Sequence, residues 1–172
     1  YIARPCHYQS RPLPKVCDYA YWTNARFAPE VVQETDRAVD AILKASGARQ
    51  IRLFGYSGGG VLAALVAQSR SDVAALVTFS SPLDHAEWTR LKGFTALDRS
   101  FNPINGVAQL RGVPQFHFWG EDDDVVPLRA IQSFVEKSLA AGGEARIIRV
   151  PDVGHRCCWQ DEWPALYPAE LR

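Results

Sequence analysis

The spacing of hydrophobic positions changes several times along the chain and predicts helices that alternate with strands. From Glu30 to Gly47, apolar residues recur at helical spacing among charged neighbours, which predicts an amphipathic helix. A second such helix is expected over residues 128–139, where Pro127 suits the first helical turn. Short, nearly continuous apolar runs, typical of strands buried on both faces, cover residues 51–56, 73–80, 115–119 and 145–150. Together these patterns predict an α/β protein with a mostly parallel sheet and helices on both of its faces.

One segment interrupts this alternation. Residues 82–112 carry many aromatic and apolar side chains without a recognisable strand, and they lie between two predicted strands. An excursion of this length in an α/β fold is commonly a lid over the functional site, and a lengthened helical crossover is the alternative. Because no repeat or low-complexity tract divides the chain, we predict one domain over residues 1–172 with the excursion inside it.

Composition and charge narrow the range of partners. The 172 residues include 19 Lys and Arg against 19 Asp and Glu, and 47% are hydrophobic, as in an ordinary globular domain. A chain without net charge has no general attraction to nucleic acid or to anionic lipid. No apolar run approaches the roughly 18 residues of a membrane-spanning helix. A small molecule is therefore the expected partner.

The first thirty residues differ from the rest. The sequence contains no Met, and Tyr1-Ile2-Ala3 is typical of the end of a buried strand, so we expect a processed or N-terminally incomplete chain. The loop that follows is rich in proline and aromatic residues and mildly basic. Its charged residues are Arg4, Arg11, Lys15 and Arg26 against Asp18. Such a loop near a site would prefer acidic substrates, whereas a solvated surface is the alternative.

Four cysteines bear on the cellular compartment. An even number in loop-like sequence favours disulfides, an oxidising compartment and hence an exported protein, and we favour the pair Cys6–Cys17. Four reduced cysteines in a cytoplasmic protein are the alternative. A zinc site is less favoured, because the paired Cys-x-x-Cys spacing is absent. Its ligands would come from Cys6, His7, Cys17, His155, Cys157 and Cys158.

Residues 55–59 carry the clearest chemical signal. They read Gly-Tyr-Ser-Gly-Gly and fit the pattern Gly-x-Ser-x-Gly at a predicted strand-to-helix turn. A nucleophile there needs a tight turn with small neighbours, and the next helix directs its N-terminal N–H groups at the same point. We therefore predict Ser57 as a nucleophile and the Gly58 N–H as an oxyanion donor. A glycine-rich turn that only packs a helix against a strand is the alternative.

A serine nucleophile needs a base, and the base needs an acid to orient it. In a sheet of this kind the expected order is serine, acid, histidine, each after a strand. His155 follows the last predicted strand in a short loop, whereas His117 lies inside a strand and is expected in the core. Three consecutive aspartates, residues 122–124, follow the preceding strand, and the spacing leaves the choice among them open. A solvated acidic turn or a cation site are the alternatives for this run.

With these motifs the chain resembles the α/β-hydrolase superfamily, and within it the bacterial serine esterases and lipase-like enzymes. The resemblance covers residues 1–155 and rests on the turn at 55–59, the loop at 120–127 and Gly154-His155. In that family the acid loop often reads Gly-x-x-Asp-x-x-Val-Pro, which here selects Asp123. The resemblance implies a serine hydrolase that cleaves a carboxylic ester or similar acyl substrate through Ser57, His155 and Asp123, with an acyl-enzyme and no metal or organic cofactor.

The resemblance also implies segments that this sequence lacks, among them the first strands and the loop that supplies a second oxyanion donor. Tyr56 and Trp88 are expected to contact the substrate, with Phe94 and Trp159 as further walls of an apolar pocket, whereas core packing is the alternative. An acyltransferase or peptidase with the same triad, or a non-catalytic binding module that retains the turn, are the alternative functions.

Overall fold

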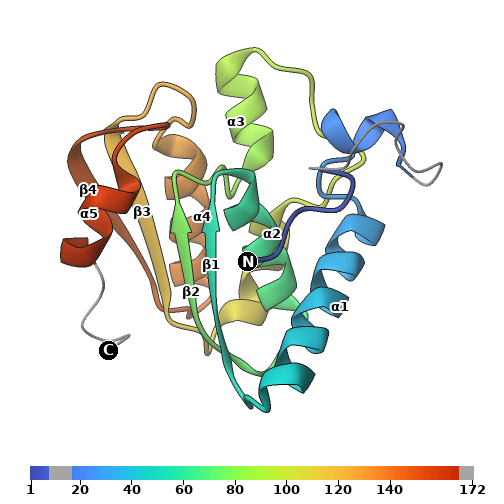
Figure 1. The fold of residues 1–172 in the computed structure, drawn as a ribbon. Coiled ribbons are helices and arrows are strands. Elements are labelled where there is room, and N and C mark those ends of the chain that lie inside the picture. Colours follow the sequence, from blue (N-terminus) through green and yellow to red (C-terminus); the bar gives the residue numbers. More distant parts are fainter. Residues whose placement is uncertain (8–16, 167–172) are drawn as a thin grey trace.

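The computed structural model describes residues 1–7 and 17–166. In this part of the chain, four strands form one sheet (Figure 1). Neighbouring strands are parallel throughout, and the strands lie in chain order. They are β1 (Ile51–Tyr56), β2 (Val73–Phe79), β3 (Gln115–Asp122) and β4 (Ala145–Gly154). The predicted α/β class with a parallel sheet is confirmed.

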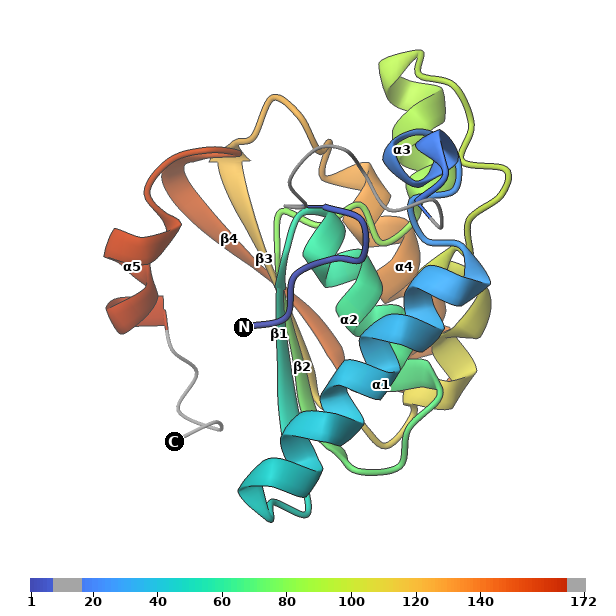
Figure 2. The same ribbon diagram turned by 45° about the vertical axis from the view of Figure 1, so that its right-hand side comes forward.

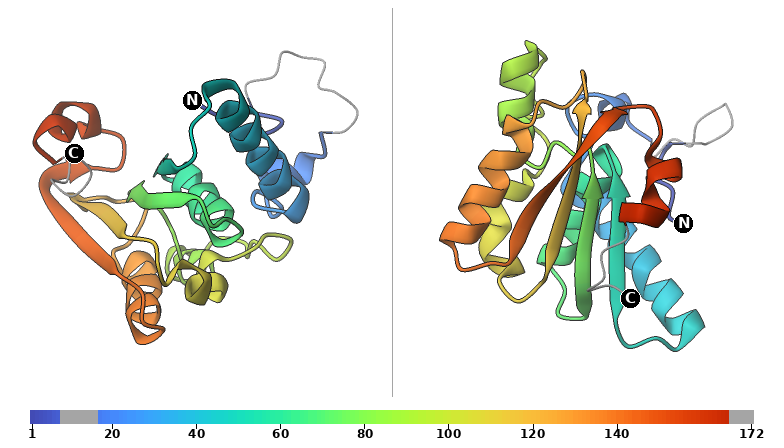
Figure 3. Two further views of the ribbon diagram at one scale, coloured as in Figure 1. Left: turned by 90° about the horizontal axis from the view of Figure 1, so that it is seen from below. Right: turned by 90° about the vertical axis from the view of Figure 1, so that its left-hand side faces the viewer.

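Helices cover both faces of the sheet (Figures 2 and 3). The larger core lies where α2, η2 and α4 pack on one face, with α1 outside α2, and a smaller core lies between α5 and the other face. The helices are η1 (Tyr19–Trp22), α1 (Pro29–Ser46), α2 (Gly58–Gln68), α3 (His85–Lys92), η2 (Pro103–Leu110), α4 (Arg129–Ala140) and α5 (Trp159–Leu166), η marking 3-10 helices. Across residues 1–7 and 17–166, none of them has the length and apolar character needed to cross a bilayer.

Local sequence explains the ends and faces of the helices. Pro29 occupies the first turn of α1, and Gly47 ends that helix in the left-handed conformation with φ of 70°, where its N–H bonds the Leu43 carbonyl. Residues 60–67 of α2 are all buried, because α2 lies between the sheet and α1. The predicted helix after Glu30 and the buried helix after the glycine turn are both confirmed.

Three local predictions differ from the structure. β3 and β4 run past their predicted ends, to Asp122 and Gly154, which carries the chain directly to the predicted acid and base. Pro127 lies just before α4 rather than in its first turn, and its carbonyl accepts the Ala130 N–H. Residues 1–4 form no strand, and Tyr1 is fully exposed. The prediction of a buried strand end there was wrong, because a strand needs a hydrogen-bonded neighbour and β1 pairs only with β2 in the described chain.

The excursion divides into two parts with different surroundings. Helix α3 stands at the carboxyl end of the sheet, above the strand ends (Figure 1). In contrast, η2 packs into the main core through the buried residues Val107 and Leu110. The lid function expected for residues 82–112 remains a prediction.

His117 of β3 lies in the core, as expected. Its Nδ1 atom is 2.8 Å from Thr78 Oγ1, and its ring meets the Phe134 ring edge-on at 5.4 Å between centroids. Complete burial lowers the pKa of His117 to about 3, because the interior cannot solvate an imidazolium. His117 is therefore a neutral structural residue in the folded protein.

This burial predicts a loss of stability in acid. The unfolded chain binds a proton at His117 near pH 6.5 and the folded chain only near pH 3, so the stabilisation is complete above pH 6.5 and is lost as the pH falls toward 3. We expect the free energy of unfolding of the wild type to fall faster than that of His117→Gln, by up to about 1.4 kcal/mol per pH unit in this window. Urea unfolding of both proteins at several pH values measures it, and equal pH dependence would contradict it.

Candidate active site

The turn between β1 and α2 presents Ser57 at the carboxyl end of the sheet. Ser57 has φ of 51° and ψ of −124°, a conformation that residues with a side chain rarely adopt. Its N–H donates to the Phe79 carbonyl of β2 at 2.8 Å, and its own carbonyl accepts the Gly60 N–H at 3.0 Å. Hydrogen bonds thus hold the backbone of Ser57 in an unfavourable conformation. Strained residues that are held in this way are concentrated at functional sites.

Two glycines make this turn possible. A Cβ atom on Gly55 would lie 2.4 Å from the Cα atom of Gly60, and a Cβ on Gly60 would lie 2.0 Å from Ser81 Oγ. A Cβ on Gly59 would meet nothing within 4 Å. Of the two outer glycines in the motif, Gly55 and Gly59, only Gly55 has no room for a side chain. The second close approach involves Gly60, which the motif does not include.

This difference between neighbouring glycines can be tested. We expect Gly55→Ala to lower the free energy of unfolding by about 1–3 kcal/mol or more, since the added methyl group overlaps backbone that cannot rotate away. Gly59→Ala is the matched control, and we expect it to be neutral or stabilising by up to about 1 kcal/mol, because alanine favours helix. Chemical denaturation of the two variants measures both effects. Equal stability of the two variants would show that the backbone of Gly55 is not tightly packed against Gly60.

Asp123 and His155 form a hydrogen-bonded pair. Nδ1 of His155 lies 2.9 Å from Oδ2 of Asp123, and both side chains are buried. Oδ1 of Asp123 accepts the N–H groups of Val125 at 2.9 Å and Val126 at 2.8 Å. Both carboxylate oxygens are therefore held, and among the three consecutive aspartates Asp123 is the one that contacts His155.

Electrostatics favour an ionised Asp123. Burial raises the pKa of this carboxyl group, but hydrogen bonding outweighs burial, so its pKa lies below the usual range. The contacts with good geometry come from the His155 ring and from the N–H groups of Val125 and Val126. With Asp123 ionised, Nδ1 of His155 is the donor, and a neutral imidazole then leaves Nε2 unprotonated.

Tyr56 connects the turn to His155, the predicted base. Its hydroxyl donates to the His155 carbonyl at 2.5 Å, and the two rings lie 5.2 Å apart between centroids. Since Tyr56 precedes Ser57, this contact brings the predicted nucleophile and base to the same edge of the sheet. No hydrogen bond joins Ser57 Oγ to the His155 ring among the described side chains. Bonds of this kind are often long without substrate and shorten in the reacting complex.

The surroundings of Trp88 differ from the substrate pocket predicted for it. Its indole N–H donates to the Val125 carbonyl at 2.9 Å, and its ring meets Phe94 edge-on. Lys92, also from α3, donates to the carbonyl of Asp124. Helix α3 therefore braces the acid loop, and Trp88 lines neither of the two cavities beside the site. No local pattern in the sequence predicts this contact, because it joins residues 37 positions apart.

Two cavities flank the turn. One of about 700 Å³ lies between the N-terminal segment, α1, α2 and the outer edge of β1, and it reaches Gly58 and Arg4. The other, of about 660 Å³, lies beside His155 and is mostly aromatic. Trp159, one of the expected pocket walls, lines this second cavity, whose other residues are Phe54, Tyr56, Phe79, His155, Arg156, Cys158, Gln160 and Trp163.

Tyr56 provides a test of how the base is positioned. We expect Tyr56→Phe to slow the reaction of Ser57 with a fluorophosphonate by about 5–10-fold, because one hydrogen bond to the His155 backbone is lost. The control is Tyr21→Phe, which removes the exposed hydroxyl that donates to Glu30, far from His155 in sequence. Mass spectrometry of timed reactions measures the rates. Unchanged labelling of Tyr56→Phe would show that this contact does not position the base.

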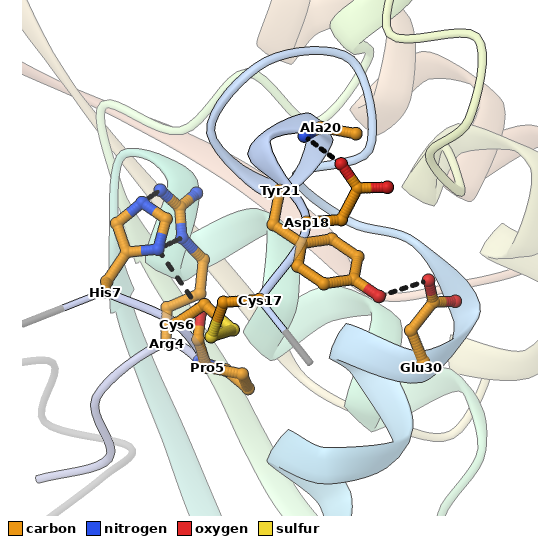
Figure 4. The surroundings of a disulfide bond; sticks show 9 residues. All are labelled: Arg4, Pro5, Cys6, His7, Cys17, Asp18, Ala20, Tyr21 and Glu30. Atoms are coloured by element: carbon orange, nitrogen blue, oxygen red, sulfur yellow. Dashed lines mark hydrogen bonds between the residues drawn. A yellow bond between two sulfur atoms is a disulfide. The ribbon is translucent and has the colours of Figure 1, made fainter. Parts of the chain in front are cut away.

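The cysteines form disulfides rather than a metal cluster. Cys6 and Cys17 are bonded, as favoured from the sequence, and Cys157 is bonded to Cys158 (Figure 4 shows the first pair). The six residues considered for zinc do not gather at one point. More generally, the described residues contain no group of three or more Cys, His, Asp or Glu side chains placed to hold a metal.

Comparisons with known proteins identify the fold. No family model and no curated protein matches the chain by sequence. Many solved structures match the fold. They include a puromycin hydrolase (21% identity, TM-score 0.63), an esterase from Pyrococcus furiosus (15%, 0.64) and a putative dienelactone hydrolase from Klebsiella pneumoniae (19%, 0.59). The matches cover 77%, 84% and 81% of this chain but only 23%, 62% and 54% of those proteins. The chain therefore has the α/β-hydrolase fold and spans less than two thirds of the length of these proteins.

Proposed function

We propose that this chain carries the nucleophile, base and acid of a serine hydrolase that acts on a carboxylic ester or a similar acyl substrate. The observation that carries the proposal is the buried Asp123–His155 pair, joined at 2.9 Å and linked through Tyr56 to the strained turn at Ser57. A structural histidine would not need an ionised, fully hydrogen-bonded carboxylate at the strand ends, whereas a general base does.

In the proposed reaction, the Ser57 hydroxyl oxygen attacks the carbonyl carbon while Nε2 of His155 takes the hydroxyl proton. The carbonyl oxygen becomes an oxyanion next to the Gly58 N–H. When the tetrahedral intermediate collapses, the bond to the leaving alcohol breaks, and the alcohol takes the proton from His155. Water then attacks the acyl-enzyme through the same base, which releases the acid and restores Ser57.

The electrostatic properties of the turn support this sequence of steps. Asp123, with its lowered pKa, stays negative and stabilises the imidazolium that forms on His155. The N-terminus of α2 begins at Gly58, so its free N–H groups and dipole favour the negative charge on the oxyanion. Both charges of the transition state thus have a partner.

We further propose that the protein acts in an oxidising compartment as an exported protein. The Cys6–Cys17 disulfide supports this location, and no free cysteine occurs in the described chain.

Labelling with a fluorophosphonate tests the proposed triad. We expect a single adduct on the chain, no adduct on Ser57→Ala, and labelling slowed by about 10²-fold to 10⁴-fold in His155→Ala and Asp123→Asn, because proton transfer to the base is lost or misdirected. The matched controls are Ser46→Ala and Asp124→Asn, which change an exposed serine and the aspartate next to the acid. Intact mass over time measures the rates.

Two results would contradict the proposal. A folded chain that remains unlabelled would favour a binding module that only retains the turn. Equal effects of Asp123→Asn and Asp124→Asn would show that the Asp123–His155 contact has no role in activating the serine. If labelling succeeds, trapping the acyl group with water or with added amines and alcohols distinguishes hydrolysis from acyl transfer.

A further inference from the structure

Helix α3 donates two side-chain hydrogen bonds to the backbone of the acid loop. Nζ of Lys92 lies 2.7 Å from the carbonyl oxygen of Asp124, and Nε1 of Trp88 lies 2.9 Å from the carbonyl oxygen of Val125. The reaction steps proposed above use neither donor. The two carbonyls belong to consecutive peptide groups, so the helix holds two adjacent peptide groups of the loop.

The same two peptide groups also hold the proposed acid. Their N–H ends are those of Val125 and Val126, which donate to Oδ1 of Asp123 at 2.9 and 2.8 Å. A peptide group is planar, so a donor that fixes the direction of its carbonyl also fixes the direction of its N–H. A hydrogen bond at the carbonyl also polarises the peptide group and strengthens its N–H as a donor. Both contacts of α3 are therefore transmitted to the carboxylate of Asp123.

A third donor at the loop lacks this connection. Nε1 of Trp119 in β3 lies 2.9 Å from the carbonyl oxygen of Val126. The next residue is Pro127, whose nitrogen carries no hydrogen, so this peptide group has no N–H to direct at the carboxylate. Trp88 and Trp119 thus make the same bond to neighbouring carbonyls, but of these two bonds only the one from Trp88 continues to Asp123.

The start of α3 is itself anchored to other helices. Oδ1 of Asp84, which precedes the helix, accepts the Glu87 N–H at 3.3 Å and the Asn102 side-chain amide at 2.9 Å. Oδ2 of Asp84 accepts the hydroxyl of Ser133 in α4 at 3.0 Å, and the Asp84 N–H donates to the carbonyl of Ala130 at 2.8 Å. Because these contacts fix α3 to α4, the helix can hold the acid loop in one position.

We propose that Trp88 and Lys92 are positioning residues, which orient the proposed acid toward the base. This proposal rests on the proposed hydrolase function and adds a form of control to it, because Ser57 then reacts fast only while α3 lies against the acid loop. Core packing alone would explain the burial of Trp88. It would not explain why two donors of one helix reach the two peptide groups that bind the carboxylate.

Fluorophosphonate labelling of Ser57 measures this effect in matched variants. We expect Trp88→Phe to react about 5-fold to 10-fold more slowly than the wild type, because one hydrogen bond to the loop is lost. The matched control is Trp119→Phe, which loses the same bond at the neighbouring carbonyl, and we expect a change of less than about twofold. Lys92→Met is expected to slow labelling by about twofold to fivefold, whereas Lys92→Arg restores the rate because it keeps a donor.

The same substitution in an Asp123→Ala background separates positioning from a general effect on the fold. Without the carboxylate, the two peptide groups hold no acid, so we expect Trp88→Phe to change the remaining rate by less than about twofold. An equal loss in both backgrounds would overturn the proposal. Equal losses for Trp88→Phe and Trp119→Phe in the wild-type background would overturn it as well.

A second measurement does not depend on the reactivity of Ser57. Burial raises the pKa of Asp123 and hydrogen bonds from the loop N–H groups lower it, so weaker donation raises it. We expect the midpoint of its titration, followed by NMR at the two amide groups that bind it, to rise in Trp88→Phe but not in Trp119→Phe. If this rise occurs while every folded variant stays unlabelled, the hydrolase function is contradicted and the positioning is supported. An unchanged midpoint in Trp88→Phe would overturn the positioning, whatever the labelling shows.

Discussion

The arrangement of the candidate site depends on how closely the backbone of β1 passes the first turn of α2. No side chain fits between Gly55 and Gly60, and this contact forces the chain to reverse within Ser57. The hydrogen bond from the Ser57 N–H to Phe79 then fixes the turn to the neighbouring parallel strand. Because parallel strands end at the same edge, one close approach determines which loops can reach the serine and aims the N-terminus of α2 at it.

The acid loop is fixed by a different device, in which hydrogen bonds hold the backbone around Asp123. The indole N–H groups of Trp88 and Trp119 donate to the carbonyls of Val125 and Val126, while the N–H groups of these two valines bind the carboxylate. The N–H and the carbonyl of both Val125 and Val126 are thus hydrogen-bonded. Helix α3 contributes one of the two indoles, so part of the excursion supports the loop that carries Asp123.

The sequence predicted what depends on local pattern and left out what depends on distant contacts. The alternation of apolar runs and helical spacing was sufficient for the α/β class, and the placement of Ser57 and His155 after strands was sufficient to bring them to one edge. The choice of Asp123 needed a family pattern, because three neighbouring aspartates have equal local context. The roles of Gly60 and Trp88 depend on Ser81 and Val125, distant in sequence, and no local signal marks them. The strand end predicted at Tyr1 is absent for a related reason, because local strand propensity does not decide which strands pair.

Charge is distributed unevenly along the carboxyl edge of the sheet, and the order of the strands explains why. Asp123 follows β3, two strands away from the turn, and reaches the site only through the His155 ring. Arg4 lies on the opposite side, against α2 and the outer edge of β1. In the proposed reaction, positive charge develops on the imidazole toward Asp123, and negative charge develops on the acyl oxygen toward the Gly58 N–H at the start of α2. The field across Ser57 therefore points in the direction in which the reaction separates charge, and this preorganised field needs no rearrangement when the transition state forms.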